Sequence, residues 1–289
     1  MFDRFKYKDF ARRQLKSRLI IPSLIILSIV VLNFLIALPL PKSLLSFVEK
    51  FMNAPADERI SLFNLLSKTD KLSLLIFYIV MLIVHFVTEF TQNAYFIKMT
   101  RTPENIPFKE FLFAFKKTPR ALITGLWMYL WVFIWSFLIT LGLIVAAFAV
   151  SVLLKFTGIT GGFITIIPLI IFFGVLIPMI YKLLQYSFTF IIAAEFQKMR
   201  IRRCLQLSII ITKGHIKDLF ILYLSFILWF IASFFTRGII DMIFKPYLKL
   251  TLINACHALI MEACEAGIIN SEEVQNEIQI QSASETDSE

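Results

Sequence analysis

Three charged residues recur at helical spacing in a strongly apolar part of the chain. Asp241, Lys245 and Lys249 stand at i, i+4 and i+8 between residues 238 and 260, so one face of a helix would carry all three. Ionisable side chains inside a membrane-spanning helix are costly and mark candidate functional sites. At a rise of about 1.5 Å per residue, the two lysines would lie about 10 and 16 Å beyond residue 238.

Two interpretations of this face remain open. One is a polar cavity that binds an anionic group, lined by Asp241, Lys245, Tyr247, Lys249 and, from an earlier apolar segment, Lys182. The other is structural: Asp241 neutralises Lys245, in the acid-first order that favours an intrahelical pair, and the lysine stems extend toward the interface. The first interpretation leads to a transporter and the second to a packed membrane protein.

A second polar face occurs between residues 72 and 96 and consists of His85, Glu89, Gln92 and Asn93. His and Glu at i and i+4 are able to ligate a metal, but two ligands do not define a site. Glu89 would lie about 26 Å along the helix from residue 72, near the headgroups at the inner face. The sequence therefore favours an interfacial polar cluster over a metal site, and we expect no metal and no cofactor.

Catalytic motifs are missing from the sequence. It contains no GxSxG, HExxH or GxxxxGK[ST] pattern and no paired carboxylates of an intramembrane protease. We therefore expect a non-enzymatic protein. A membrane enzyme built around His85 and Glu89 would need a further polar group to converge on them.

Composition places the chain among multi-pass membrane proteins. Hydrophobic residues make up 58% of it and charged residues only 17%, against about 45–50% and about 25% in soluble domains. We expect an all-α fold with six spans, because a helix needs about 20 apolar residues to cross a bilayer. The spans are expected at residues 19–40, 72–96, 121–153, 163–190, 219–235 and 238–260.

The distribution of Lys and Arg predicts the orientation of these spans. Segments 1–18, 97–120 and 196–218 hold seven, six and six basic residues, whereas 41–71, 154–162 and 236–237 hold five, one and one. Because basic loops stay in the cytoplasm, both termini are expected there. Residues 1–265 would form one membrane domain, followed by an acidic, disordered tail at 266–289.

The basic segments precede three of the spans and predict three helical hairpins, each led by a basic amphipathic helix on the cytoplasmic surface. Tyr7-Lys8-Asp9-Phe10 precedes the first span and Phe108-Lys109-Glu110-Phe111 precedes the third, while 200–217 shares only the basic character. Such helices favour contact with anionic lipid headgroups rather than nucleic acid. In the third span, Gly142 and Ala146 form a small-xxx-small pair that predicts close helix packing.

The second half of the chain carries a family resemblance. Its residues are Lys213-Gly214-His215, the run Leu222-Tyr223-Leu224-Ser225-Phe226-Ile227, Trp229, Gly238 and Pro246-Tyr247, with Trp135-Ser136, Ile177-Pro178 and Tyr186-Ser187 upstream. Over about residues 105–260 the chain resembles bacterial multi-pass membrane proteins known as domain of unknown function 975. This resemblance implies a protein of the bacterial cell membrane and brings no established activity.

Taken together, these features lead us to expect an integral cell-membrane protein that is lipid-binding or serves envelope maintenance or immunity. The alternative is a small-molecule or peptide transporter whose embedded lysines bind an anionic substrate. The two differ in what Lys245 and Lys249 should contact. A transporter needs a continuous polar cavity that reaches them, whereas a packed membrane protein needs them paired. Protein partners and oligomeric state do not follow from the sequence.

Overall fold

The fold is all-helical in the part of the chain that the computed structural model describes, which is residues 2–38, 42–55, 58–59, 61, 66–157, 163–236 and 238–269. Residues 270–289 of the expected tail lie outside this part. The helices are α1 (Arg4–Leu15), α2 (Ile20–Ala37), α3 (Lys42–Asn53), α5 (Lys68–Arg101), α6 (Phe108–Ala114), the short 3₁₀ helix η1 (Phe115–Lys117), α7 (Thr118–Thr157), α8 (Phe163–Tyr186), α9 (Thr189–Glu195), α10 (Ile201–Thr212), α11 (Ile216–Leu224), α12 (Ile227–Phe235) and α13 (Asp241–Glu265).

Burial divides the long helices into two parts. On α5, the large apolar side chains from Leu72 to Ile83 are mostly exposed, whereas those from Phe86 to Met99 are almost all buried. The same change occurs between α8 and α9, because Leu183 is exposed and nearly every residue from Leu184 to Phe196 is buried. We call the exposed parts the arms and the buried part the base.

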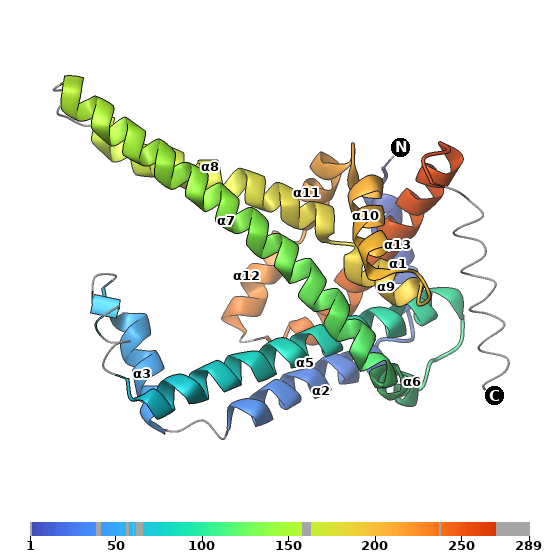
Figure 1. Cartoon of the computed structure of the whole chain (residues 1–289). Coiled ribbons are helices and arrows are strands. Elements are labelled where there is room, and N and C mark those ends of the chain that lie inside the picture. The colour runs from blue at the N-terminus through green and yellow to red at the C-terminus, as the bar shows by residue number, and fades with distance from the viewer. Residues whose placement is uncertain are drawn as a thin grey trace.

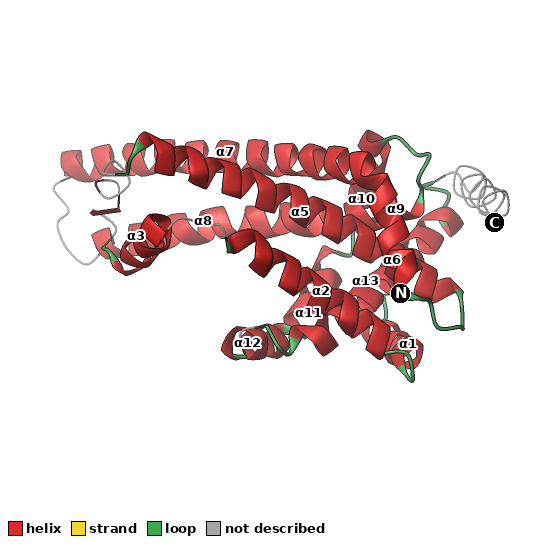
Figure 2. Ribbon diagram, turned by 90° about the horizontal axis from the view of Figure 1, so that it is seen from below, coloured by secondary structure: helices red, strands yellow, loops and turns green. Residues whose placement is uncertain are grey.

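The base consists of α1, α6, η1, the end of α8 from Leu184, α9, α10, α13 and the end of α5 from Phe86. The arms are α2, the earlier part of α5, α7, α8 up to Leu183, α11 and α12. Two views agree that α2 with α5, and α7 with α8, extend away from the base, near which the N-terminus lies (Figures 1 and 2). Exposed apolar side chains such as Phe133 and Phe148 on α7 are those expected to face lipid.

Five stretches of helix in the described residues are long and apolar enough to cross a membrane: Ile20–Ala37, Lys68–Arg101, Phe108–Val152, Phe173–Glu195 and Ile216–Phe235. They confirm a multi-pass α-helical membrane protein. The sixth expected span corresponds to α13, which is a continuous helix of 25 residues but is not among the five.

Two of the expected spans are interrupted. The span expected at 163–190 divides into α8 and α9 at Ser187 and Phe188, and the one expected at 219–235 divides into α11 and α12 at Ser225 and Phe226. In each break the serine hydroxyl donates to the carbonyl three residues earlier, Ser187 to Leu184 at 2.8 Å and Ser225 to Leu222. Such local bonding competes with helix continuation.

The amphipathic segments expected on the surface are helices. Residues 7–10 belong to α1, residues 108–115 belong to α6 and the start of η1, and residues 200–217 contain α10. Each has an apolar face that packs into the base, with Tyr7, Phe111 and Cys204 buried. Asp3 caps α1 by accepting hydrogen bonds from the backbone of Phe5 and Lys6, at 3.0 and 3.1 Å.

Helices α5 and α7 approach closely at Gly125. A Cβ atom placed on Gly125 would lie 2.3 Å from the ring of Phe86 on α5, which is closer than atoms tolerate. At Gly142, which the sequence analysis singled out, an added Cβ would meet nothing within 4 Å. The close packing of α7 is therefore found nearer the base than its small-xxx-small pattern predicted.

We expect Gly125→Ala to destabilise the protein by about 1–3 kcal/mol, because the added methyl group must displace the Phe86 ring in a packed contact. Gly142→Ala is the matched control on the same helix and should be neutral. Thermal unfolding of both variants in detergent micelles measures the difference. Equal melting temperatures for the two variants would contradict the contact.

Candidate functional site

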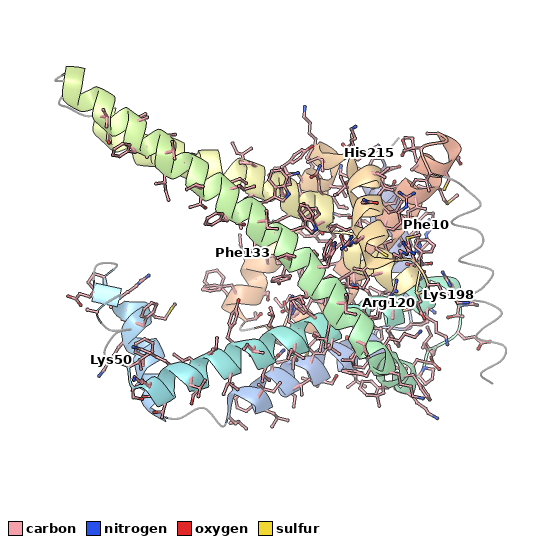
Figure 3. The ribbon with its side chains drawn as sticks, in the orientation of Figure 1. Phe10, Lys50, Arg120, Phe133, Lys198 and His215 are labelled. Atoms are coloured by element: carbon pink, nitrogen blue, oxygen red, sulfur yellow. The ribbon has the colours of Figure 1, made fainter. Side chains whose placement is uncertain are left out.

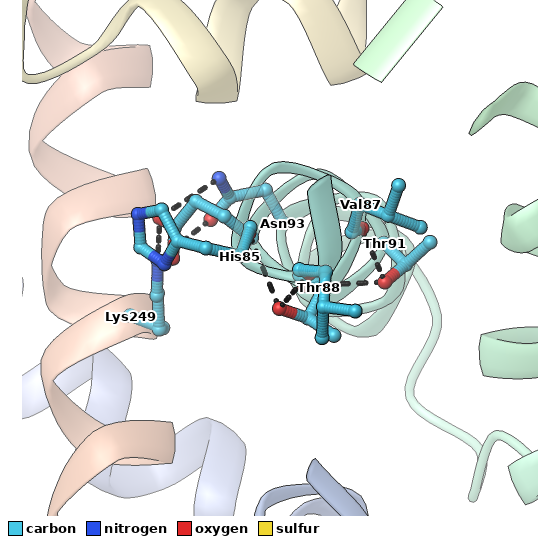
Figure 4. Close-up of polar contacts among 8 residues, drawn as sticks. His85, Val87, Thr88, Thr91, Asn93 and Lys249 are labelled. Carbon is cyan, nitrogen blue, oxygen red and sulfur yellow. Dashed lines mark hydrogen bonds and ion pairs between the residues drawn. The ribbon is translucent and has the colours of Figure 1, made fainter. Parts of the chain in front are cut away.

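The two polar faces singled out in the sequence meet in the structure. Lys249 of α13 extends to α5, where its Nζ donates to Oε1 of Glu89 in a short ion pair and to Oδ1 of Asn93 at 3.3 Å (Figure 4). The Asn93 amide in turn donates to Glu89 at 3.5 Å. His85 lies beside this pair on the same face of α5, and Gln92 is buried. The sequence located both partners without pairing them.

The other expected cavity residues have separate partners. Lys245 pairs with Asp241 at 2.9 Å, as the i, i+4 spacing predicted, and Asp241 also accepts a hydrogen bond from Ser233. Lys182 donates to Gln185 at 3.1 Å and lies 4.0 Å from the ring centroid of Trp135 on α7. These contacts place four of the five residues expected around one cavity at three separate places in the fold.

Tyr247 is the fifth of these residues, and its ring contacts aromatic and cationic neighbours. It packs edge-on against Phe226 at 5.5 Å between centroids, and the guanidinium of Arg12 lies 5.9 Å from its ring centroid. Tyr247 therefore faces α1 and the α11–α12 junction, whereas Lys249 faces α5. Two residues apart on α13, they point to different neighbours.

A second charged cluster surrounds Glu195, the last residue of α9. Its side chain is only 6% exposed, yet it forms a short ion pair with Arg101 of α5. Its Oε2 atom lies 3.1 Å from Nε2 of His257 on α13. A buried carboxylate is stable only when it is paired, and here two basic groups supply the pairing. Sequence reasoning missed this cluster, although Glu195 is the only acidic residue between residues 163 and 217.

The two clusters join the same three helices. Glu89 and Lys249 link α5 to α13, Arg101 and Glu195 link α5 to α9, and Glu195 and His257 link α9 to α13. The returning limbs of the three expected hairpins end in α5, α9 and α13. Each of these ends is therefore tied to both of the others by ionisable side chains inside the base.

Three basic residues also tie the beginning of each hairpin to its end. Arg18, before α2, donates to the carbonyls of Thr102 and Glu104 after α5, at 2.7 and 2.9 Å. Arg120, at the start of α7, donates to the carbonyls that follow α9, those of Phe196 and Met199, at 2.7 and 2.8 Å. In the third hairpin, His215 lies 3.7 Å from Glu262.

Arg18 and Arg120 suit the positions they occupy, because helix ends expose unpaired carbonyls that attract cations. The bond to carbonyls occurs at these two places, whereas His215 lies beside a side-chain carboxylate. In the base, oppositely charged side chains neutralise each other, and the shortest ion pairs join different helices. Among the described residues, no group of three His, Cys, Asp or Glu side chains is placed to hold a metal ion.

One protein-family model matches nearly the whole of the chain. A family model described as protein of unknown function (DUF975) matches residues 1–259. The chain belongs to the DUF975 family. No curated protein and no solved structure matches it.

The DUF975 match confirms the family expected from the sequence and extends the range of residues that it covers. The resemblance noted from the sequence covered about residues 105–260, whereas the family model also includes the first hairpin, α1, α2 and α5. The first hairpin is part of the base through Glu89, Arg101 and Arg18. A family domain that begins with residue 1 fits a structure in which all three hairpins share one charged core.

The ion pair between Glu89 and Lys249 should contribute strongly to stability. We expect Lys249→Met to destabilise the protein by about 3 kcal/mol, because it leaves the Glu89 carboxylate unpaired between helices. The double variant Glu89→Gln with Lys249→Met should recover part of this loss. Chemical or thermal unfolding in detergent micelles measures the double-mutant cycle.

Lys245→Met is the matched control, since Lys245 is half-exposed and pairs within its own helix. Solvent-screened pairs of this kind contribute only about 0.3–0.5 kcal/mol. Equal losses at Lys245 and Lys249 would contradict the special role of the link between α5 and α13.

Proposed function

We propose that this DUF975 protein is a non-enzymatic, multi-pass protein of the bacterial cell membrane that binds anionic phospholipids through the cationic surface of its base. The observation that carries this proposal is the division of its charges. Charges inside the base are paired with each other, whereas most of the exposed charges on its surface are basic. Anionic headgroups are attracted to such surfaces next to a membrane.

The exposed basic residues come from all three lead-in segments. They are Lys6, Arg12, Arg13, Lys16, Lys109, Lys116, Lys198, Arg200, Arg202, Lys213 and Lys217. Among the described residues, the exposed acidic residues in the same region are fewer, namely Asp3, Asp9, Glu104 and Glu265. The helices that present these cations have their apolar faces buried in the base, so the positive charge faces outward on a rigid support.

The pairing of the lysines supports this proposal over transport. A carrier of an anionic substrate needs Lys245 and Lys249 available on a polar pathway, but both form ion pairs, and Lys249 does so between helices. The compensated charges are those expected of a packed membrane protein. Envelope maintenance and immunity remain compatible biological settings for a lipid-binding component.

We further propose that the membrane domain is built of three hairpins with both termini in the cytoplasm. The positive residues of the base support this orientation. The third hairpin is the shallowest, because the hydroxyl of Ser23 donates to the carbonyl of Met242 at 2.8 Å. Ser23 is in the first turn of α2, so the start of α13 lies near the membrane face at which α2 begins.

Lipid composition around the purified protein tests the proposed function. In nanodiscs of mixed phosphatidylglycerol and phosphatidylethanolamine, we expect enrichment of the anionic lipid that decreases with salt. Lys109→Gln with Lys116→Gln should reduce this enrichment, since each basic residue near the surface contributes roughly 1 kcal/mol. Mass spectrometry of the retained lipids measures the ratio.

The control for this test is Lys50→Gln with Lys68→Gln, at the ends of α3 and α5 that lie far from the base. Figure 3 shows Lys50 at the opposite end of the molecule from Lys198. Enrichment that is unchanged by loss of the base cations, or that falls equally in the control, would rule out the base as the anionic-lipid surface.

Cysteine labelling in whole cells tests the orientation. In a Cys264→Ser background, Lys50→Cys should react with a membrane-impermeant thiol reagent, whereas Lys116→Cys should react only after permeabilisation. Ile239→Cys distinguishes the layouts of the third hairpin: we expect protection from the outside, while six full spans would expose it. Labelling of Lys116→Cys in intact cells would reverse the proposed orientation.

A further inference from the structure

A groove of about 440 Å³ opens between the end of α1, α12 and the start of α13. Its volume falls within the range of about 300–1,000 Å³ in which proteins bind small ligands. The groove combines two kinds of wall. One consists of basic side chains from the last turn of α1 and its cap, and the other of aromatic and aliphatic side chains from α12 and α13.

The basic wall contains Arg12, Arg13 and Lys16, all exposed. In the described part of the chain, the acidic side chain paired with this wall is Asp9, which lies 2.7 Å from Arg13. One carboxylate against three cations leaves the wall positively charged. Because three basic side chains cluster at the end of a helix, where the dipole does not repel cations, they stay close together despite their like charge.

Neighbouring cations extend this positive region along α1. Lys8 donates to Ser225 at 2.7 Å and lies 4.4 Å from the ring centroid of Phe226, beside the groove. Burial, together with the nearby positive charges of Arg12 and Arg4, lowers the pKa of Lys8. The positive charges of Arg12 and Arg4 that act on Lys8 would also stabilise an anion bound nearby.

The apolar wall contains Trp229, Ile243 and Phe244. The rings of Trp229 and Phe244 stack with 5.8 Å between centroids and 3° between planes, which gives the wall a fixed surface. Trp229 and Ile243 are 43% and 55% exposed, so the described residues leave this wall uncovered. Close by, Ile20 and Leu24 at the start of α2 are exposed as well, at the point where the chain is expected to enter the bilayer.

A ligand that satisfies both walls must be an anion with an apolar chain attached. We propose that this groove binds one anionic phospholipid, with its phosphate between Arg12 and Lys16 and the beginning of an acyl chain along Trp229 and Ile243. The groove opens beside exposed apolar residues of α2, so the acyl chain would continue into the bilayer. A soluble phosphate compound would leave the apolar wall uncovered, and a neutral lipid would leave the cations without a partner.

This inference rests on the proposed binding of anionic lipid but concerns a single, tightly held molecule rather than the lipid around the base. The two are separable because different residues carry them. Arg12 and Lys16 line the groove, whereas Lys109 and Lys116 belong to α6 and η1. Arg13 is left unchanged in the test because it already pairs with Asp9.

Native mass spectrometry of the full chain, released from detergent with phosphatidylglycerol present, tests the groove. We expect one phosphatidylglycerol retained per protein, and retention roughly tenfold weaker in Arg12→Gln with Lys16→Gln. Ile243→Trp, which fills the groove without changing its charge, should weaken retention similarly. Lys109→Gln with Lys116→Gln should retain the lipid as the unaltered protein does.

Two further measurements in the same experiment identify the class of ligand. Phosphatidylethanolamine should be retained weakly, and excess glycerol 3-phosphate should fail to displace phosphatidylglycerol because it lacks the acyl chains. Thermal unfolding confirms that each variant is folded. Displacement by glycerol 3-phosphate, undiminished retention in the Arg12 and Lys16 variant, or equal loss in the Lys109 and Lys116 variant would each overturn the proposed site. If the unaltered protein retained one lipid but showed no enrichment of anionic lipid in nanodiscs, that result would instead count against the broader proposed function.

Discussion

Charges that leave water must be paired, and in this protein that requirement connects the three returning helices. Glu89 with Lys249, Glu195 with Arg101, and Glu195 with His257 link α5, α9 and α13 in all three combinations. An unpaired partner in such a setting costs several kcal/mol. The apolar surfaces of these helices would pack in more than one register, whereas the charged contacts fit only one. We infer that the ion pairs select the arrangement of the base.

The base also sets the orientation of the arms, although helices of one hairpin, such as α7 and α8, contact each other as well. Apolar side chains on the arms gain nothing from helix packing over lipid, since both environments are equally apolar. The arms therefore need their orientation set elsewhere. Arg18, Arg120 and His215 hold the beginning of each hairpin against its own end, inside the base. The direction of each arm is therefore constrained where it is attached to the base.

Sequence patterns predicted the parts of this structure that depend on local composition. The apolar runs gave the positions of the long helices, and the amphipathic segments gave α1, α6 and α10, because periodicity and charge are readable along one helix. The i, i+4 pair of Asp241 and Lys245 was predictable for the same reason. Both polar faces that meet at Lys249 were also recognised, as separate features.

What the sequence could not supply was the pairing between distant helices. Glu89 and Lys249 are 160 residues apart, and no local pattern indicates that α13 crosses α5 at that point. Glu195 was overlooked because it ends an apolar stretch and resembles an ordinary boundary residue. The position of α13 beside α2 is a related case: counting residues along one helix does not indicate that the start of α13 meets the first turn of α2, where the hydroxyl of Ser23 donates to the carbonyl of Met242. In a protein organised by a charged base, the position of each charge depends on which helix it meets, and that is a property of the fold as a whole.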